Sequence, residues 1–136
     1  MKEQLITFET AKLAKEKGFD ENCYSYYKNE ELKLGPFCKT ITSNLYGKRT
    51  EIFKYTNSEK DNHITAPTQS LLQKWLREEH QIYVEAHIAI YTSQTFAWHL
   101  AYRFGAEVRT NGCTEYIYTT YEEALEIGLQ EALKLI

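Results

Sequence analysis

Apolar and polar residues alternate over 82–91 and again over 96–104. Successive side chains of a strand point to opposite faces, so each segment is predicted to be a strand with one buried and one solvated face. The two apolar faces match when Ile90 pairs with Phe96 across a short loop at 92–94, because this register keeps the parity of both strands. A slip of one residue would turn the apolar face of one strand toward solvent.

The dipeptide Asn111-Gly112 is the clearest hairpin signal in the chain. Both central positions of a type I′ turn require positive φ, which asparagine and glycine tolerate. The dipeptide therefore predicts a hairpin between a strand that ends near Thr110 and a third strand over 114–119. Together with the preceding pair this gives a three-stranded meander, in which Gly105 is expected to form a bulge.

Helical spacing of apolar residues predicts two helices in the first half of the chain. One covers 8–17, where Thr7 can cap the free N–H groups and Gly18 fits the left-handed position beyond the end. The other starts near Pro67 and continues through Glu79, because a proline has no N–H to lose in a first helical turn. The apolar stripe of the second helix consists of Leu71, Leu72, Trp75 and Leu76.

A third helix is predicted at the C-terminal end, beginning after Thr120. Thr120 and Glu123 have the spacing of a capping box, in which the glutamate reaches back to the residue that caps the helix. Gly128 inside this helix costs about 1 kcal/mol relative to alanine, which indicates a close contact with the sheet. The apolar stripe consists of Ala124, Leu125, Leu129, Ala132, Leu133 and Ile136.

Residues 22–62 predict two or three further strands. Aromatic and β-branched residues at 23–27 and 52–55 have the composition of strands. The expected turns and polar loop lie at 35–36, 46–48 and 57–62. The whole chain is therefore predicted to be one α+β domain over 1–136, with two layers: an antiparallel sheet of about five strands and about three helices packed on one of its faces.

The net charge of −3 comes from 16 basic and 19 acidic residues that are mixed along the chain. The densest basic stretch is Lys48-Arg49, and Lys54 follows it, whereas proteins that grip a nucleic-acid backbone usually cluster their lysines and arginines. Nucleic acid is therefore a disfavoured partner. No apolar run approaches the roughly 20 residues that span a membrane, so no membrane partner is expected.

The cysteines Cys23, Cys38 and Cys113 are widely spaced and include no CxxC pair. This spacing indicates neither a zinc module nor a disulfide framework. The N-terminal residues also lack the long apolar run of a signal peptide. We therefore expect a cytoplasmic protein with reduced thiols.

Three segments carry a resemblance to known sequences: 6–13 (ITFETAKL), 66–78 (APTQSLLQKWLRE) and 121–129 (YEEALEIGL). Together they resemble a group of small uncharacterised proteins encoded in bacterial and phage genomes. The resemblance implies a compact domain of helices and sheet in a bacterial or phage setting. It implies no activity, cofactor or catalytic residue.

The candidate chemistry lies on the solvated face of strands 82–91 and 96–104. In the predicted register His87 lies opposite His99, Tyr83 lies opposite Arg103, and Glu85 is a diagonal neighbour of the histidines. Two histidines on adjacent strands come within reach of one metal ion or one phosphate. Three ligands do not clearly converge, however, so a strand face with mixed polar residues is the competing interpretation, and no metal or cofactor is predicted.

Tyr116 and Tyr118 would extend this face if they lie beside His99. An aromatic and polar face suits a protein partner or a stacked nucleotide base. The competing interpretation is that the tyrosines only cover half-buried strands. The candidate ligand-binding residues are Tyr83, Glu85, His87, His99, Arg103, Tyr116 and Tyr118.

Other reactive residues offer weaker signals. The segment 63–65 (HIT) resembles half of a paired HxT phosphodiesterase motif, but the second half would have to be 87–89 (HIA), which lacks the hydroxyl. His80 is expected to interact with the last carbonyls of the second helix. Cys113 has no base or helix N-terminus in its neighbourhood to lower its pKa, so a packed thiol is expected. No catalytic residue is predicted.

These observations favour a non-enzymatic binding protein, such as a phage or mobile-element accessory factor that acts on a host protein. A second copy of the chain is another option for the protein partner. The alternative function is a binder or hydrolase of a small nucleotide-like ligand that uses His87 and His99. Replacing both histidines by alanine distinguishes the two, because only the alternative requires them.

Overall fold

The computed structural model describes residues 3–43, 45, 47–58, 62–89, 94–113 and 115–136. The helices are α1 (Phe8–Glu16), α2 (Gln69–His80) and α3 (Tyr121–Leu133). The strands are β1 (Tyr26–Lys28), β2 (Glu31–Lys33), β3 (Phe37–Ser43), β4 (Gly47–Phe53), β5 (His63–Thr65), β6 (Ile82–Ile88), β7 (Phe96–Phe104) and β8 (Glu107–Gly112). The predicted α+β class is therefore confirmed. None of these helices is long and apolar enough to cross a membrane, as judged over the described ranges.

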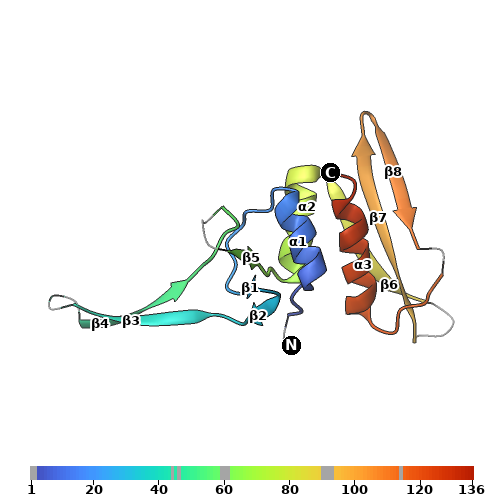
Figure 1. Cartoon of the computed structure of the whole chain (residues 1–136). Coiled ribbons are helices and arrows are strands. Elements are labelled where there is room, and N and C mark those ends of the chain that lie inside the picture. Colours follow the sequence, from blue (N-terminus) through green and yellow to red (C-terminus); the bar gives the residue numbers. More distant parts are fainter. Residues whose placement is uncertain (1–2, 44, 46, 59–61, 90–93, 114) are drawn as a thin grey trace.

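The strands of the described chain divide among three antiparallel sheets, with the orders β2–β1–β5, β3–β4 and β6–β7–β8. The predicted single sheet of about five strands is thus not confirmed. Figure 1 shows the helices in the middle of the molecule, the β6–β7–β8 sheet on one side and the β3–β4 hairpin projecting on the other. Helix α3 packs on β6 and β7, α2 packs on β6 and α3, and α1 packs on α3 and β5.

Helix α1 begins at Phe8 as predicted and ends at Glu16, one residue before the predicted end. The Thr7 hydroxyl accepts a hydrogen bond from the backbone N–H of Thr10, which satisfies one of the free donors of the first turn. Gly18 follows the helix with φ +91°, a conformation that costs glycine little. The chain then folds back, because the N–H of Phe19 donates to the Ala14 carbonyl over 2.9 Å and the Phe19 side chain is buried.

Helix α2 starts at Gln69, two residues later than predicted. Thr68 is the capping residue, since its hydroxyl accepts a hydrogen bond from the Leu71 N–H at 3.1 Å. Pro67 precedes the cap and lies outside the helix, and its carbonyl accepts a hydrogen bond from the N–H of Ile6. The helix extends to His80, one residue beyond the predicted end.

Helix α3 has the predicted cap at Thr120, whose hydroxyl accepts a hydrogen bond from the Glu123 N–H at 3.1 Å. The return contact of the capping box differs from the prediction. The Glu123 carboxylate accepts hydrogen bonds from the N–H and the hydroxyl of Thr119, one residue before the cap. The predicted close contact at Gly128 is confirmed, because a Cβ there would lie 3.0 Å from both Trp98 Cβ and Val84 Cγ1.

The predicted register of β6 and β7 is wrong by two residues. Phe96 pairs with Ile88 rather than with Ile90, which lies outside the described residues. A shift of two keeps every side chain on its predicted face of the sheet. Ile82, Val84, Trp98 and Leu100 are buried as expected, whereas Ile88 and Phe104, at the ends of the strands, are exposed. The shift does change the partners on the solvated face: Glu85, not His87, lies directly opposite His99.

The third strand of the meander also differs from the prediction. Gly105, expected to form a bulge, has φ +63° and belongs to the turn between β7 and β8. Asn111 and Gly112 do not form a turn but end β8, where Gly112 lies opposite His99. The predicted strand over 114–119 is absent from the described part of that segment, in which Tyr118 makes only an isolated bridge with Phe96.

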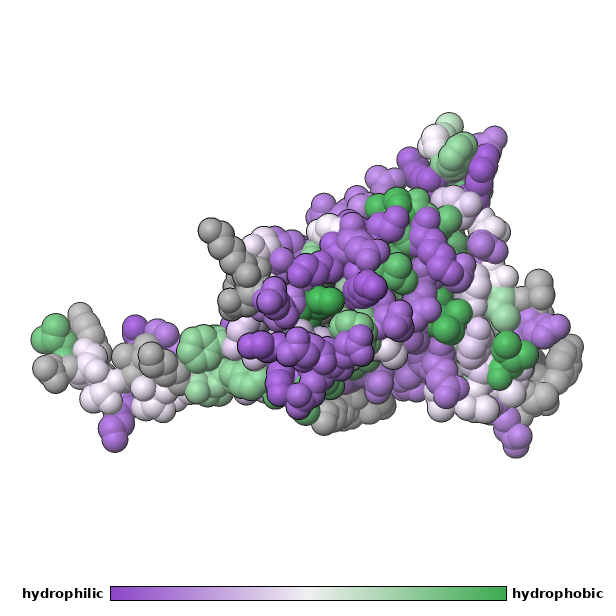
Figure 2. Space-filling view, in the orientation of Figure 1, coloured by the Kyte–Doolittle hydropathy of each residue, from purple (hydrophilic) through white to green (hydrophobic). Residues whose placement is uncertain are grey.

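Residues 22–62 contain four strands, β1 to β4, where two or three were predicted. The expected turn at 35–36 separates β2 from β3 and contains a cis peptide bond before Pro36. The expected turn at 46–48 and loop at 57–62 lie partly outside the described residues. Every residue of β4 is exposed, and Figure 2 shows apolar side chains near the base of this projecting hairpin.

Candidate functional site

The structure brings together four of the seven candidate residues on the solvated face of β6 and β7. The rings of His87 and His99 have centroids 6.0 Å apart, and those of His87 and Tyr116 are 5.9 Å apart. Glu85 lies across from His99, with 3.7 Å between its Oε1 and His99 Nδ1. We refer to Glu85, His87, His99 and Tyr116 as the histidine cluster.

The other three candidates lie elsewhere. Tyr83 lies opposite Ala101 rather than opposite Arg103, so this predicted pair is wrong. Tyr83 and Arg103 instead line a small hollow of about 100 Å³. Tyr118 is half-buried and packs against the hydrophobic core. The candidate site is therefore smaller than the seven residues predicted.

The histidine cluster is open to solvent. The side chains of His99 and Glu85 are 39% and 69% exposed, so water screens their attraction and the pair contributes at most about 1 kcal/mol. Gly112 leaves room for the imidazole, because a Cβ there would lie 3.3 Å from His99 Cδ2. Over the described residues, no three His, Cys, Asp or Glu side chains are placed to hold a metal ion.

A buried carboxylate, which the sequence analysis missed, joins the three helices. Glu126 of α3 is only 8% exposed. Its Oε1 accepts hydrogen bonds from the Thr7 N–H at 2.8 Å, the Thr7 hydroxyl at 2.7 Å and the Thr10 hydroxyl. Its Oε2 accepts from the side-chain amide of Gln69 at 2.9 Å. The negative charge thus lies at the N-terminus of α1, where the free N–H groups and the helix dipole favour it.

The residues around this carboxylate make further hydrogen bonds with one another. The Gln130 amide donates to the Thr10 hydroxyl at 3.0 Å, and the Gln69 amide also donates to the Glu122 carbonyl. The pKa of the Tyr27 phenol is raised, first by burial and second by the charge of Glu126. Since the Tyr27 hydroxyl donates to the Ile6 carbonyl, its role is also structural. This network holds the three helices together, and Thr7, Gln69 and Glu126 also help to line a hollow of about 530 Å³.

A groove of about 850 Å³ lies beside the β1–β2 hairpin. Its rim carries the exposed side chains of Tyr24, Leu32 and Leu34, which are 47%, 39% and 53% exposed. Leu71 of α2, which is half-buried, also lines the hollow. We call this hollow the leucine groove. Its remaining lining residues are Glu3, Gln4, Leu5, Asn22, Cys23, Ser25, Gly35, Pro36, Ala66, Pro67, Thr68, Ser70 and Lys74.

The floor of the leucine groove is chemically inert. Cys23 is 3% exposed, and its burial raises the pKa of the thiol to about 11, with a smaller lowering effect from Thr65. Such a thiol is a poor nucleophile because little thiolate forms near neutral pH. The Ser25 hydroxyl accepts a hydrogen bond from the Gly35 N–H at 2.9 Å. The exposed leucines and tyrosine of the groove therefore suit contact with apolar groups.

The weaker chemical signals have structural roles. His63 is buried, its Nε2 lies 3.1 Å from the Thr56 carbonyl, and its ring packs on Tyr26 and Tyr55. His80 packs its ring on Trp75 at 4.5 Å. The Cys113 thiol donates to the Glu115 carbonyl at 2.8 Å.

Comparison with known proteins adds no further evidence on function. No protein-family model, curated protein or solved structure matches the chain. The function must therefore be argued from the leucine groove, the histidine cluster and the exposed strands.

Proposed function

We propose that this chain is a non-enzymatic binding protein that receives an apolar segment of a protein partner in the leucine groove. The observation that carries the proposal is the exposure of Tyr24, Leu32 and Leu34 around one concave, apolar surface. Covering such side chains removes apolar area from water, which stabilises a complex by about 25 cal/mol per Å² before the cost of association.

The backbone beside the groove supports an extended partner. In the order β2–β1–β5, β2 is the edge strand, and no other described strand covers its outer side. An edge strand presents free N–H and C=O groups to which a peptide can add as a further strand. Leu32 belongs to β2 and Leu34 directly follows its end, so both lie near the edge to which such a peptide would add.

The resemblance to small proteins of bacterial and phage genomes supports a host protein as the partner. An accessory factor of this kind needs a recognition surface and no active site. Lys74 and Glu3 line the same groove and provide opposite charges for orienting a peptide. We expect the partner segment to be extended and to carry apolar residues at every second position.

A paired set of variants tests this proposal. Leu34→Asp places a charge on the rim of the groove, whereas Val108→Asp places the same charge on β8, where Val108 is 67% exposed and outside the groove. Tagged protein and both variants are incubated with lysate of the bacterial host, and captured proteins are quantified by mass spectrometry. We expect Leu34→Asp to lose a stoichiometric partner that Val108→Asp retains. Equal capture by both variants would refute the groove as the binding site.

The histidine cluster supports a second candidate function, the binding or hydrolysis of a small nucleotide-like ligand. The observation in its favour is the gathering of His87, His99 and Tyr116 on one solvated face. Titration calorimetry with a panel of nucleoside monophosphates tests it. Heat of binding that disappears in the double variant His87→Ala/His99→Ala would support this candidate, and the absence of heat with wild type would exclude these ligands.

A further inference from the structure

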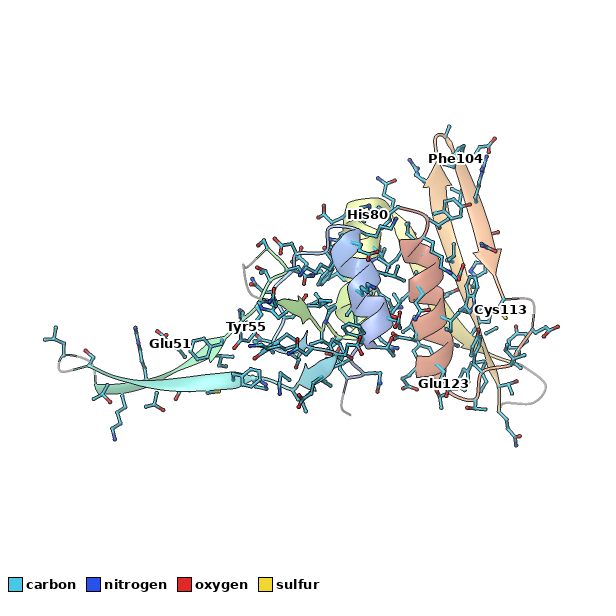
Figure 3. The ribbon with its side chains drawn as sticks, in the orientation of Figure 1. Glu51, Tyr55, His80, Phe104, Cys113 and Glu123 are labelled. Atoms are coloured by element: carbon cyan, nitrogen blue, oxygen red, sulfur yellow. The ribbon has the colours of Figure 1, made fainter. Side chains whose placement is uncertain are left out.

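Every residue of β4 is exposed, and its outer edge pairs with no other described strand. Its pairing partner is β3, and the two strands form a separate sheet that projects from the body. Figure 3 shows Tyr55 at the base of this hairpin and Glu51 further out along it. A hairpin of two strands is at best marginally stable in water by itself, and an unprotected edge readily pairs with another chain.

The sequence of β4 complements itself when it is read in the opposite direction. Antiparallel pairing about Thr50 brings all seven residues of Gly47–Phe53 opposite residues of the second strand. In that register Arg49 lies opposite Glu51 of the second copy, and Glu51 lies opposite Arg49 of the second copy. Pairing about Arg49 or about Glu51 would instead place like charges directly opposite each other and would shorten the overlap.

We infer that β4 pairs antiparallel with β4 of a second copy of the chain, with Thr50 at the two-fold axis. The result is a four-stranded sheet in the order β3–β4–β4–β3 that crosses the dimer. The interface is isologous, since each copy contributes the same strand edge. The inference concerns a different surface from the leucine groove and does not rest on the proposed function.

The charges on one face of the hairpin are already arranged for this pairing. Within one chain Arg49 Nη2 lies 3.0 Å from Glu51 Oε1, and the two side chains are 67% and 47% exposed. Residues two apart on a strand share a face, so the dimer would set two arginines and two glutamates in alternation. Each Arg49 then has a carboxylate beside it on its own strand and another across the interface.

The opposite face of the hairpin contributes apolar contact. Lys48 lies opposite Ile52 of the second copy in this register, so the methylene stem of the lysine can cover the isoleucine. Ile52 is 52% exposed in the single chain. Thr50 faces its own copy across the axis, and threonine pairs at such positions stabilise antiparallel strands.

Charge reversal tests the register directly. Arg49→Glu leaves glutamate at both 49 and 51, and Glu51→Arg leaves arginine at both, so each variant repels its own copy. We expect the dissociation constant of the dimer, measured by analytical ultracentrifugation, to rise by roughly tenfold or more in each variant. An equimolar mixture of the two variants places opposite charges across every pair and is expected to restore a one-to-one dimer.

Two controls separate this contact from other effects. Arg109→Glu changes the net charge by the same amount as Arg49→Glu but lies on β8. It should leave the dissociation constant of the dimer unchanged. In a Cys38→Ser background, Thr50→Cys should form an intermolecular disulfide with diamide, whereas Glu51→Cys, which lies off the axis, should form much less. Wild type that stays monomeric at all concentrations, or variants whose mixture fails to dimerise, would overturn the inference. Neither result would affect the binding of a partner in the leucine groove.

Discussion

The backbone N–H of Thr7 donates to the carboxylate of Glu126 over 2.8 Å, which ties the capping residue of α1 to the middle of α3. The same carboxylate reaches α2 through Gln69. A charge that is removed from water in this way is tolerated only when its oxygens are fully hydrogen-bonded. The contact therefore fixes the relative placement of all three helices.

Glu126→Gln should destabilise the protein by about 2–4 kcal/mol, because one carboxylate oxygen becomes an NH₂ group that faces other donors. The free energy of unfolding in urea measures this loss. Glu131→Gln is the matched control in the same helix, since the Glu131 contact with Lys134 is exposed and should contribute less than about 1 kcal/mol. Equal midpoints for both variants would contradict the structural role of Glu126.

The capping threonines of the three helices should contribute unequally to the stability of the protein. Thr120→Ala and Thr68→Ala each remove one capping hydroxyl, at a cost of about 1 kcal/mol. Thr7→Ala removes a cap and also the hydroxyl that donates to Glu126, so its cost should reach about 2–3 kcal/mol. Chemical denaturation of the three variants under one condition ranks them. A Thr7 variant as stable as the Thr120 variant would show that the second contact contributes nothing.

Gly128→Ala should destabilise the protein although alanine is the better helix former. The added methyl would lie 3.0 Å from Trp98 Cβ and Val84 Cγ1, and crowding a packed core costs about 1–3 kcal/mol against a helical gain of about 1 kcal/mol. Combining the change with Val84→Ala should recover part of the loss. A double-mutant cycle from thermal unfolding measures this coupling, and strict additivity would rule out the close contact.

Stability should fall between pH 9 and 11 because of Cys23. The unfolded thiol loses its proton near the ordinary pKa of 9.0, whereas burial holds the pKa of the folded thiol at about 11. Deprotonation therefore stabilises the unfolded state first, by up to about 1.4 kcal/mol per pH unit, and the contribution present below pH 9 is lost as the pH rises. The free energy of unfolding should decline less between pH 9 and 11 in Cys23→Ala than in wild type. Replacing the exposed Cys38 by alanine should leave the decline as steep as in wild type.

The helices were predictable from local chemistry. Thr7, Gly18 and Thr120 act through contacts within a few residues, so their sequence spacing suffices to place the ends of α1 and the start of α3. The alternation in β6 and β7 also predicted correctly which side chains share a face of the sheet. It could not fix the register, because a shift of two residues leaves both faces unchanged and only the length of the connecting segment differs.

The remaining errors come from interactions that are distant in sequence. Gly112 has the composition of a turn, but the structure uses it where β8 passes close to His99 and Trp98. The burial of Glu126 was not predicted, because a glutamate in a helix normally lies on the solvated side. Its position next to Leu125 of the apolar stripe was the only available signal. The leucine groove depends on the meeting of the β1–β2 hairpin with α2, which local patterns do not report.

The packing of α1 on α3 has a consequence for the order of events during synthesis. Ala11 and Ala14 of α1 are buried, and the Thr7–Glu126 contact spans 119 positions of the chain. During synthesis the packing of α1 is thus incomplete until α3 has left the ribosome. Truncation before α3 would leave α1 packed on β5 alone, with the apolar side that α3 covers exposed to water.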